Sequence, residues 1–169
     1  MKYMQQGGFQ HKAPMRLTIN LTLVFLAGLW VTGFAMYFQR MGLSPASVRV
    51  YYLGSEADFT NPRSYASMLE TAHAHLPMMG LVLLFLTHLI LFAPFSDKAK
   101  QRLVLLAFGS ALLEEGSGWL VRFVSPAFAP LKVASFLAFQ AVLGGLIVSL
   151  ALFLSRSAND GAPQRRRHP

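Results

Sequence analysis

The chain has 169 residues, of which 54% are apolar and only 13% are charged, and its formal net charge is +8. This composition is unlike that of soluble domains and predicts a single-domain integral membrane protein. The sequence contains no cysteine, which excludes disulfides, thiolate catalysis and cysteine-bound iron–sulfur clusters. Redox chemistry would therefore depend on haem, flavin, quinone or a metal held by histidines and carboxylates.

Four apolar runs are each long enough to cross a bilayer core of about 30 Å as a helix. They predict an all-α fold, a four-helix transmembrane bundle covering residues 17–154. The runs are residues 17–38, 72–93, 103–124 and 131–154, with a loop at 39–71 and flanking segments at 1–16 and 155–169. Because no small-residue cleavage site follows the basic N-terminal segment, we expect the first run to be retained as a helix and not removed as a signal peptide.

Basic residues gather on one side of this predicted topology. They precede the first run, join the second run to the third and follow the fourth: Lys2, Lys12 and Arg16; Lys98, Lys100 and Arg102; Arg156, Arg165, Arg166 and Arg167. By the positive-inside rule both termini are cytoplasmic and the 39–71 loop is outside. The basic tail is then a topology signal or a contact with anionic lipid, and we expect no binding to nucleic acid.

The 39–71 loop carries signals for a short helix. Ser44 and Pro45 are typical of a helix start, and Gly54 of a helix end. The apolar residues between them predict a helix lying at the outer membrane interface, where tyrosines are favoured. Asn61-Pro62 marks a turn, and Ser64 is expected to cap the next helix, which continues through Phe92.

The third run contains two adjacent carboxylates, Glu114 and Glu115, which are costly in a membrane unless protonated, paired or hydrated. At 100° per residue the two side chains point in different directions, while Arg122 shares the face of Glu115 about 10 Å farther along the axis. Two interpretations stay open: a protonated glutamate hydrogen-bonded within the bundle, or a proton path or quinone contact. Gln140 in the fourth run lies at a similar depth, and we expect it to contact Glu115.

Three of the five histidines lie on the second predicted helix. His73 and His88 are separated by about 60° around the helix and about 22 Å along it, and His75 lies nearly opposite His73. Pro77 removes the backbone hydrogen bond to the carbonyl of His73 and is expected to kink the helix. Ionisable residues within a membrane segment predict a functional site.

The histidine spacing resembles that of b-type cytochromes of respiratory and photosynthetic membranes, in which one helix carries two haem-ligating histidines about four turns apart. The resemblance implies haem b bound by His73 or His75 on the outer side and by His88 on the inner side. The other three runs contain no histidine. The second axial ligand would come from a methionine of this chain, a second copy of it or another subunit, and the available methionines are Met36, Met78 and Met79.

Several segments also resemble four-span inner-membrane proteins of proteobacteria. These segments are YYLGSE (51–56), LETAHAHLP (69–77), THL (87–89) and GSGWLVRFVSPAFA (116–129). This resemblance implies the same four-span topology in a bacterial inner membrane.

A metal site is the alternative for the start of the second helix. Glu70 and His73 are three residues apart on one helical face, as in di-iron carboxylate bundles. With His75 and either Glu56 or Asp58 they would hold zinc, copper or iron at the outer surface. A third interpretation is purely structural, with His73 and His75 at the interface and His88 hydrogen-bonded across the bundle.

The sequence therefore predicts a membrane subunit of an electron-transfer complex that binds haem b, interacts with quinone, or does both. His73, His75 and His88 are the predicted cofactor ligands, while Glu114, Glu115, Arg122 and Gln140 would carry protons or contact the quinone. The alternative is a non-catalytic accessory subunit that stabilises a larger respiratory or photosynthetic complex. Expected partners are the lipid bilayer, other membrane subunits or a second copy, and a periplasmic cytochrome. Hydrolase signatures are absent, so we assign no catalytic residue.

Overall fold

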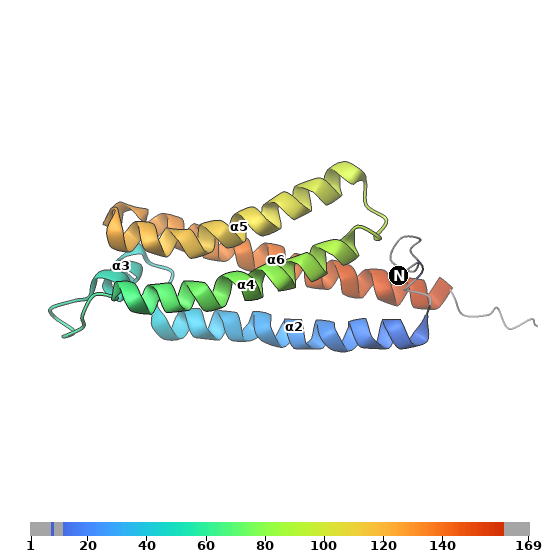
Figure 1. Cartoon of the computed structure of the whole chain (residues 1–169), viewed down its shortest axis with the longest axis horizontal. Coiled ribbons are helices and arrows are strands. Elements are labelled where there is room, and N and C mark those ends of the chain that lie inside the picture. The colour runs from blue at the N-terminus through green and yellow to red at the C-terminus, as the bar shows by residue number, and fades with distance from the viewer. Residues whose placement is uncertain (1–7, 9–11, 161–169) are drawn as a thin grey trace, which may run out of the picture.

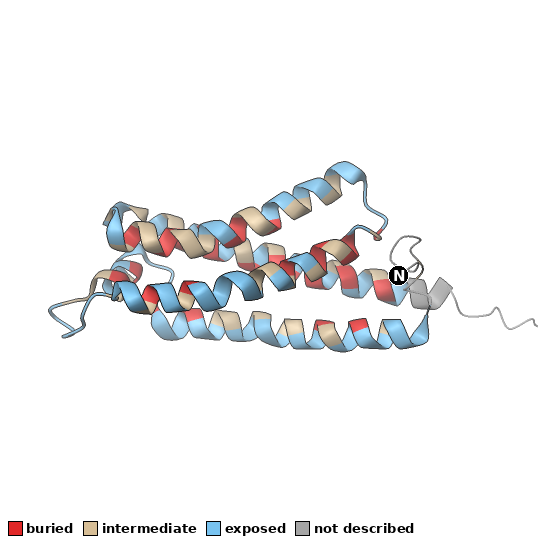
Figure 2. Cartoon of the chain, in the orientation of Figure 1, coloured by how far each residue is buried: buried red, intermediate tan, exposed pale blue. Residues whose placement is uncertain are grey.

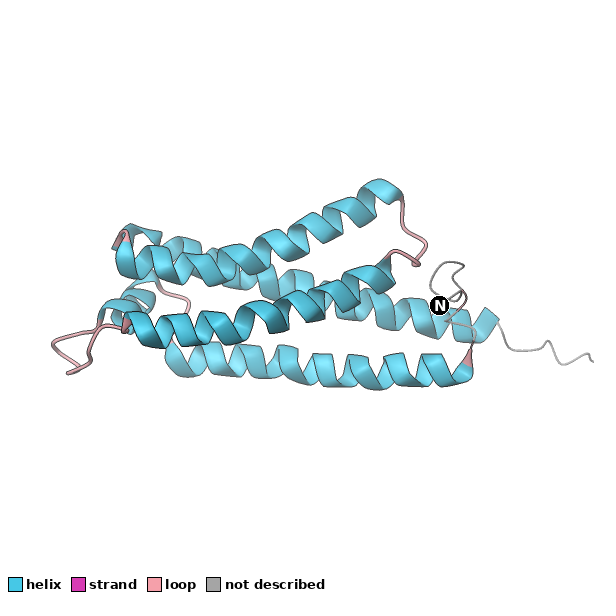
Figure 3. Ribbon diagram, in the orientation of Figure 1, coloured by secondary structure: helices cyan, strands magenta, loops and turns pink. Residues whose placement is uncertain are grey.

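A computed structural model describes residue 8 and residues 12–160, with side chains described up to residue 156. Lys2 and the arginines of the predicted basic tail, Arg165 to Arg167, lie outside the described residues. Within the described part the helices are joined by loops and there is no strand, only an isolated bridge between Ser55 and Thr60, which confirms the predicted all-α fold (Figure 3).

Four long helices make up the molecule (Figure 1). All four are long and apolar enough to cross a membrane, as predicted. They are α2 (Ala13–Arg40), α4 (Tyr65–Ile90), α5 (Asp97–Phe123) and α6 (Ala129–Asp160), with the short helices α3 (Pro45–Leu53) and η2 (Pro126–Phe128) in the connections.

The predicted helix caps are confirmed. The Ser44 hydroxyl accepts a hydrogen bond from the Ser47 amide at the start of α3, and the Ser64 hydroxyl accepts one from the Ser67 amide at the start of α4. Gly54 ends α3 with a φ of 78°, a left-handed conformation that favours glycine. The α4 helix continues through Pro77 and ends at Ile90, slightly before the predicted end at Phe92.

The α6 helix is the centre of the packing. It contacts α2, α3, α4 and α5, whereas α2 packs chiefly on α6 and makes little contact with α4 in the described part of the chain. Buried residues face inward and many large apolar side chains face outward, as expected where helices meet lipid (Figure 2). Helix α4 therefore packs on α5 and α6, and α2 packs on α6.

The two described ends of the chain lie at one end of the bundle and α3 lies at the other (Figure 1). We call these the terminal end and the α3 end. Because the number of spans is even, the two described chain ends lie on the same side of the membrane.

The α3 helix is more buried than an interfacial helix lying on the bundle would be. Val48 and Tyr52 are buried, and α3 packs on both α5 and α6. Gly118 of α5 makes this contact possible, since a Cβ atom there would lie 2.5 Å from the Tyr52 hydroxyl oxygen. The apolar residues of the loop therefore close the α3 end of the bundle.

Candidate functional site: a charged cluster in a membrane-embedded cavity

A cavity of about 410 Å³ lies between α2 and α4, with α5 and α6 behind it. All four long helices and α3 contribute lining residues. The walls are mainly apolar, but four charged or ionisable side chains from α4, α5 and α6 gather at one level: His75, Glu114, Glu115 and Lys132. We call these four residues the charged cluster.

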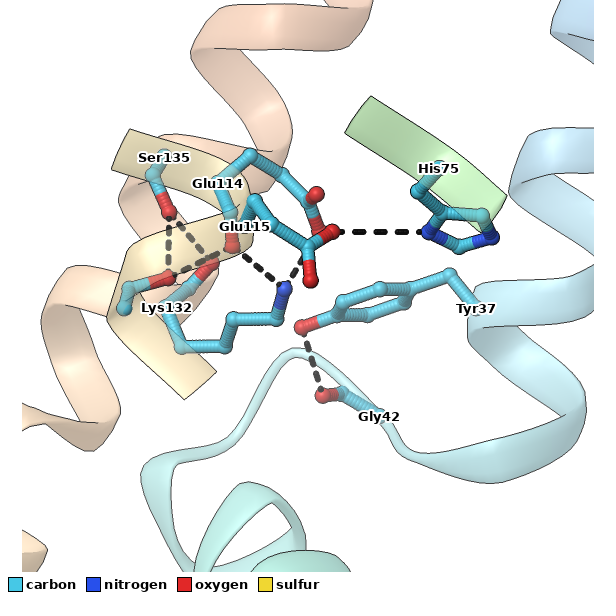
Figure 4. A network of polar contacts seen from close by, with 8 residues as sticks. Tyr37, Gly42, His75, Glu114, Glu115, Lys132 and Ser135 are labelled. Atoms are coloured by element: carbon cyan, nitrogen blue, oxygen red, sulfur yellow. Dashed lines mark hydrogen bonds and ion pairs between the residues drawn. The ribbon is translucent and has the colours of Figure 1, made fainter. Parts of the chain in front are cut away.

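Lys132 and Glu114 form the more buried half of the charged cluster (Figure 4). The Lys132 side chain is 7% exposed and that of Glu114 is 17% exposed. The Lys132 ammonium group donates to the Glu114 carboxylate and, at 2.8 Å, to the Glu114 backbone carbonyl. Both partners of this ion pair are thus removed from solvent, and the amine has two acceptors on one residue.

Lys132 points into the bundle and not toward its nearer end. Ser117 and Ser135 are hydrogen-bonded at 3.1 Å, which fixes the antiparallel register of α5 and α6. By this register the backbone of Lys132 lies nearer the α3 end than Glu114, so its amine extends inward to meet Glu114. Lysines near the ends of membrane helices ordinarily extend toward water. The inward direction therefore requires the acceptors that Glu114 supplies.

His75 and Glu115 form the second pair (Figure 4). The His75 Nδ1 atom lies 3.4 Å from a carboxylate oxygen of Glu115. His75 is 52% exposed and Glu115 is 14% exposed, so the imidazole stands at the open side of the cavity with the carboxylate behind it. As predicted, the adjacent glutamates diverge, with Glu114 turned toward α6 and Glu115 toward α4.

The charged cluster holds two carboxylates and one lysine. With both carboxylates ionised, the three groups sum to one negative charge, and a neutral His75 leaves that sum unchanged. Arg40 and Arg63 also line the cavity, so its lining holds two carboxylates and three permanent cations. The charges of the lining are therefore of both signs, and buried charges are tolerated when they are paired.

Two tyrosines add hydroxyl groups to the polar part of the cavity. The Tyr37 ring stacks on Phe136 with a centroid distance of 3.6 Å, and its hydroxyl donates to the Gly42 carbonyl at 3.4 Å. Burial of Tyr52 raises the pKa of its phenol above the usual value, and the nearby Glu114 carboxylate raises it further. Tyr52 is therefore a neutral hydroxyl group over the whole physiological pH range.

A family model described as a transmembrane helical domain, Aq_1264_TM, matches residues 42–161, which is more than half of the chain. The chain belongs to the Aq_1264_TM family. No curated protein and no solved structure matches it. The Aq_1264_TM region contains α3 to α6 and the whole charged cluster, whereas α2 precedes it.

Gln140 lines the cavity of this Aq_1264_TM protein below the charged cluster. The Trp30 indole donates to its backbone carbonyl at 2.9 Å, which ties α2 to α6. The side-chain oxygen of Gln140 is buried without a hydrogen-bond partner, so its expected contact with Glu115 is not made through this atom.

The other predicted site residues lie away from the cavity. Glu70 and His73 are exposed, and the described residues include no group of three histidine or acidic side chains placed to hold a metal ion. His88 packs edge-on against Phe92, and its Nε2 atom is buried without a partner. Arg122 donates to the Arg63 carbonyl at 2.8 Å, which joins the end of α5 to the segment before α4.

Sequence reasoning missed Lys132, Tyr37 and Tyr52. Lys132 is the only charged residue in the 131–154 run, a signal comparable to that of the adjacent glutamates. A hairpin between the third and fourth runs would have placed it near Glu114. No sequence signal predicts the inward position of Tyr52, because this depends on the space left by Gly118.

Proposed function

We propose that this protein is the membrane subunit of an electron-transfer complex and that it binds a quinone in the cavity between α2 and α4. The observation that supports this most directly is the charged cluster, with its donors and acceptors, at the wall of an otherwise apolar cavity within the spans. The volume of about 410 Å³ lies in the range of small-molecule sites.

The two pairs of the charged cluster would have different tasks. A quinone takes up one proton on each carbonyl oxygen as its ring takes up two electrons, which the partner redox protein supplies or accepts. Lys132, held by Glu114, offers a fixed positive charge and a hydrogen-bond donor to one carbonyl. His75 and Glu115, which stand at the open side, would exchange a proton with the bound ring.

Haem b is a second candidate for the same cavity, on a specific observation at His75. Its Nδ1 atom faces the Glu115 carboxylate, the arrangement that orients metal-ligating histidines in proteins. The Nε2 atom of His75 on α4 and the thioether of the lining residue Met36 on α2 would then hold the haem iron. His73 and His88 lie outside the cavity, so of the predicted ligands His75 alone serves such a haem.

The proposed setting is a bacterial inner membrane with both termini in the cytoplasm and the α3 end outside. The predicted positive-inside pattern supports this orientation. The charged cluster then opens toward the periplasmic half of the bilayer, where a periplasmic cytochrome or a neighbouring membrane subunit would exchange electrons with the quinone.

The two tryptophans of the chain, Trp30 and Trp119, both line the cavity and provide a built-in probe. Quinones quench tryptophan fluorescence on contact. We expect the purified chain in lipid nanodiscs to show saturable quenching on titration with a decyl-substituted benzoquinone. Quenching that rises linearly without saturation would contradict the proposal.

A pair of glycine variants on α2 localises the binding. Gly33 lines the cavity, and a Cβ atom there would lie 3.1 Å from the Gln140 side-chain nitrogen, whereas Gly28 faces open space. Gly33→Leu should weaken quinone binding at least tenfold, and Gly28→Leu should leave it unchanged. Equal affinity for the two variants would place the quinone elsewhere.

A reduced-minus-oxidised spectrum tests the haem candidate. A b-type α-band should disappear or shift in His75→Ala and persist in His73→Ala, because His73 is exposed on the outer side of the same helix. Absence of both a haem band and saturable quinone binding would leave the accessory-subunit role as the function.

A further inference from the structure

The cavity is elongated along the helices. On α4 its lining residues extend from Met68 to Leu83, which corresponds to about 22 Å of helix. On α6 they extend from Lys132 to Leu143, about 16 Å. A volume of about 410 Å³ spread over such a length gives a narrow chamber parallel to the bundle axis.

The polarity of the chamber changes along its length. All the charged and ionisable lining residues lie in the half nearer the α3 end, where Arg40 and Arg63 stand above the charged cluster. The half nearer the terminal end is walled largely by apolar side chains, which include Leu29, Val82, Leu83 and Leu143. A ligand that fills the chamber therefore has one polar end and one apolar end.

The chamber opens sideways between α2 and α4. Met36 of α2 and Met78 of α4 line it and are also exposed on the outside of the bundle. Both helices are membrane spans, so this opening faces lipid. A ligand that is dissolved in the bilayer reaches the chamber without passing through water.

From these three features we infer that the chamber seats one long-chain amphiphile that enters from the bilayer between α2 and α4. Its head group lies at the charged cluster, and its tail lies along α4 and α6 toward the terminal end. The inference rests on the proposed function, in which the amphiphile is an isoprenoid quinone, and adds that the protein binds the tail as well as the ring. The head group has the same orientation as the lipid head groups of the leaflet at the α3 end.

The two tryptophans report the orientation of the ligand. Trp119 lies at the α3 end, where its ring packs edge-on against Tyr65 at 5.5 Å, and Trp30 lies in the other half, bonded to Gln140. The probe is 11-bromoundecanoic acid, whose terminal bromine quenches tryptophan on contact. The Trp119→Phe variant retains only Trp30, and the Trp30→Phe variant retains only Trp119. We expect the bromo acid to quench the first variant at least threefold more than the second. Stronger quenching of Trp119 would overturn the orientation.

A second comparison tests whether the tail is bound. Val82 lines the apolar half of the chamber, and Leu84 of the same helix faces outward. Val82→Phe should weaken the decyl-substituted benzoquinone at least tenfold and change the affinity of the ring without a tail by less than twofold. Leu84→Phe should change neither. Comparing each variant with the natural chain at a fixed lipid content removes the effect of partitioning into the bilayer.

The outcomes separate the inference from the proposed function. Suppose that both quinones bind and that Val82→Phe lowers the affinity of neither, or lowers both affinities equally. The proposed binding of the tail is then wrong, and the quinone function stands. If neither quinone quenches saturably while the bromo acid does so and loses its quenching in Val82→Phe, the proposed binding of the tail stands and the quinone function is wrong. If none of the three probes quenches saturably, both are overturned.

Discussion

The ammonium group of Lys132 donates to both the carboxylate and the backbone carbonyl of Glu114, across the interface of α5 and α6. This ion pair is buried, and removal of one member of such a pair typically costs about 3–5 kcal/mol because the other charge is left without a partner. The free energy of unfolding should accordingly fall by about that amount in Lys132→Met, measured by titration with sodium dodecyl sulfate in mixed micelles.

The double variant Lys132→Met/Glu114→Gln tests this reason. With both charges removed, the free energy of unfolding should return to within about 1 kcal/mol of that of the natural chain. Lys98→Met is a matched control, because Lys98 is exposed near the start of α5 and substitution of an exposed side chain changes stability little. A double variant as unstable as Lys132→Met alone would contradict the pairing.

The contact between α3 and α5 depends on the missing side chain of Gly118. A Cβ atom there would lie 2.5 Å from the Tyr52 hydroxyl oxygen and 2.8 Å from its ring carbon Cζ. A Cβ atom at Gly116, two residues earlier, would meet nothing. We expect Gly118→Ala to be less stable than Gly116→Ala by about 1–3 kcal/mol in the same unfolding titration. Equal stabilities would show that α3 moves away without cost.

Gly144 has the corresponding role between α2 and α6. A Cβ atom there would lie 2.8 Å from the Trp30 ring carbon Cζ2, whereas Gly145 faces open space. Gly144→Ala should push Trp30 and α2 outward, so brominated phospholipid should quench Trp30 more strongly when the variant is made in a Trp119→Phe background. Gly145→Ala in that background should leave the quenching unchanged, and any increase there would argue against a specific contact.

Tyr52 gives the folded chain a dependence on alkaline pH. Its pKa is raised in the folded protein, mainly by burial, while in the unfolded chain it titrates near about 10. Above that pH the unfolded chain releases the proton and the folded chain keeps it, so the free energy of unfolding decreases as pH rises. Measured from pH 8 to pH 11, this decrease should be smaller in Tyr52→Phe. Identical slopes would show that the hydroxyl is not buried.

The helices were predictable because their signals are local. Long apolar runs, serine caps at Ser44 and Ser64, and a glycine stop at Gly54 act within a few residues of sequence, and each is found in the structure. At its N-terminal end α5 extends beyond the predicted apolar run 103–124, because polar residues from Asp97 onward continue the helical turn, and at the other end it stops at Phe123.

The site was predictable only in part. The cost of burying carboxylates identified Glu114 and Glu115, and the angle between them correctly gave two directions. The partners of these glutamates lie on α4 and α6, so they depend on how the three helices are aligned with one another. The pattern of a single helix does not determine that alignment. Likewise, the spacing of His73 and His88 describes α4 alone, and only the neighbouring helices decide that His75 is the histidine that borders the cavity.

The family match begins at residue 42, so α2 stands outside the region that defines the family, although it forms one wall of the cavity. Every member of the charged cluster lies within the family region, residues 42–161. In the proposed function, α2 therefore contributes one side of the lipid-facing opening, and the charged cluster comes from the family region. Substitutions in α2 other than at Arg40 would change the shape of that opening and leave the charged residues of the cavity in place, so selectivity could evolve separately from reactivity.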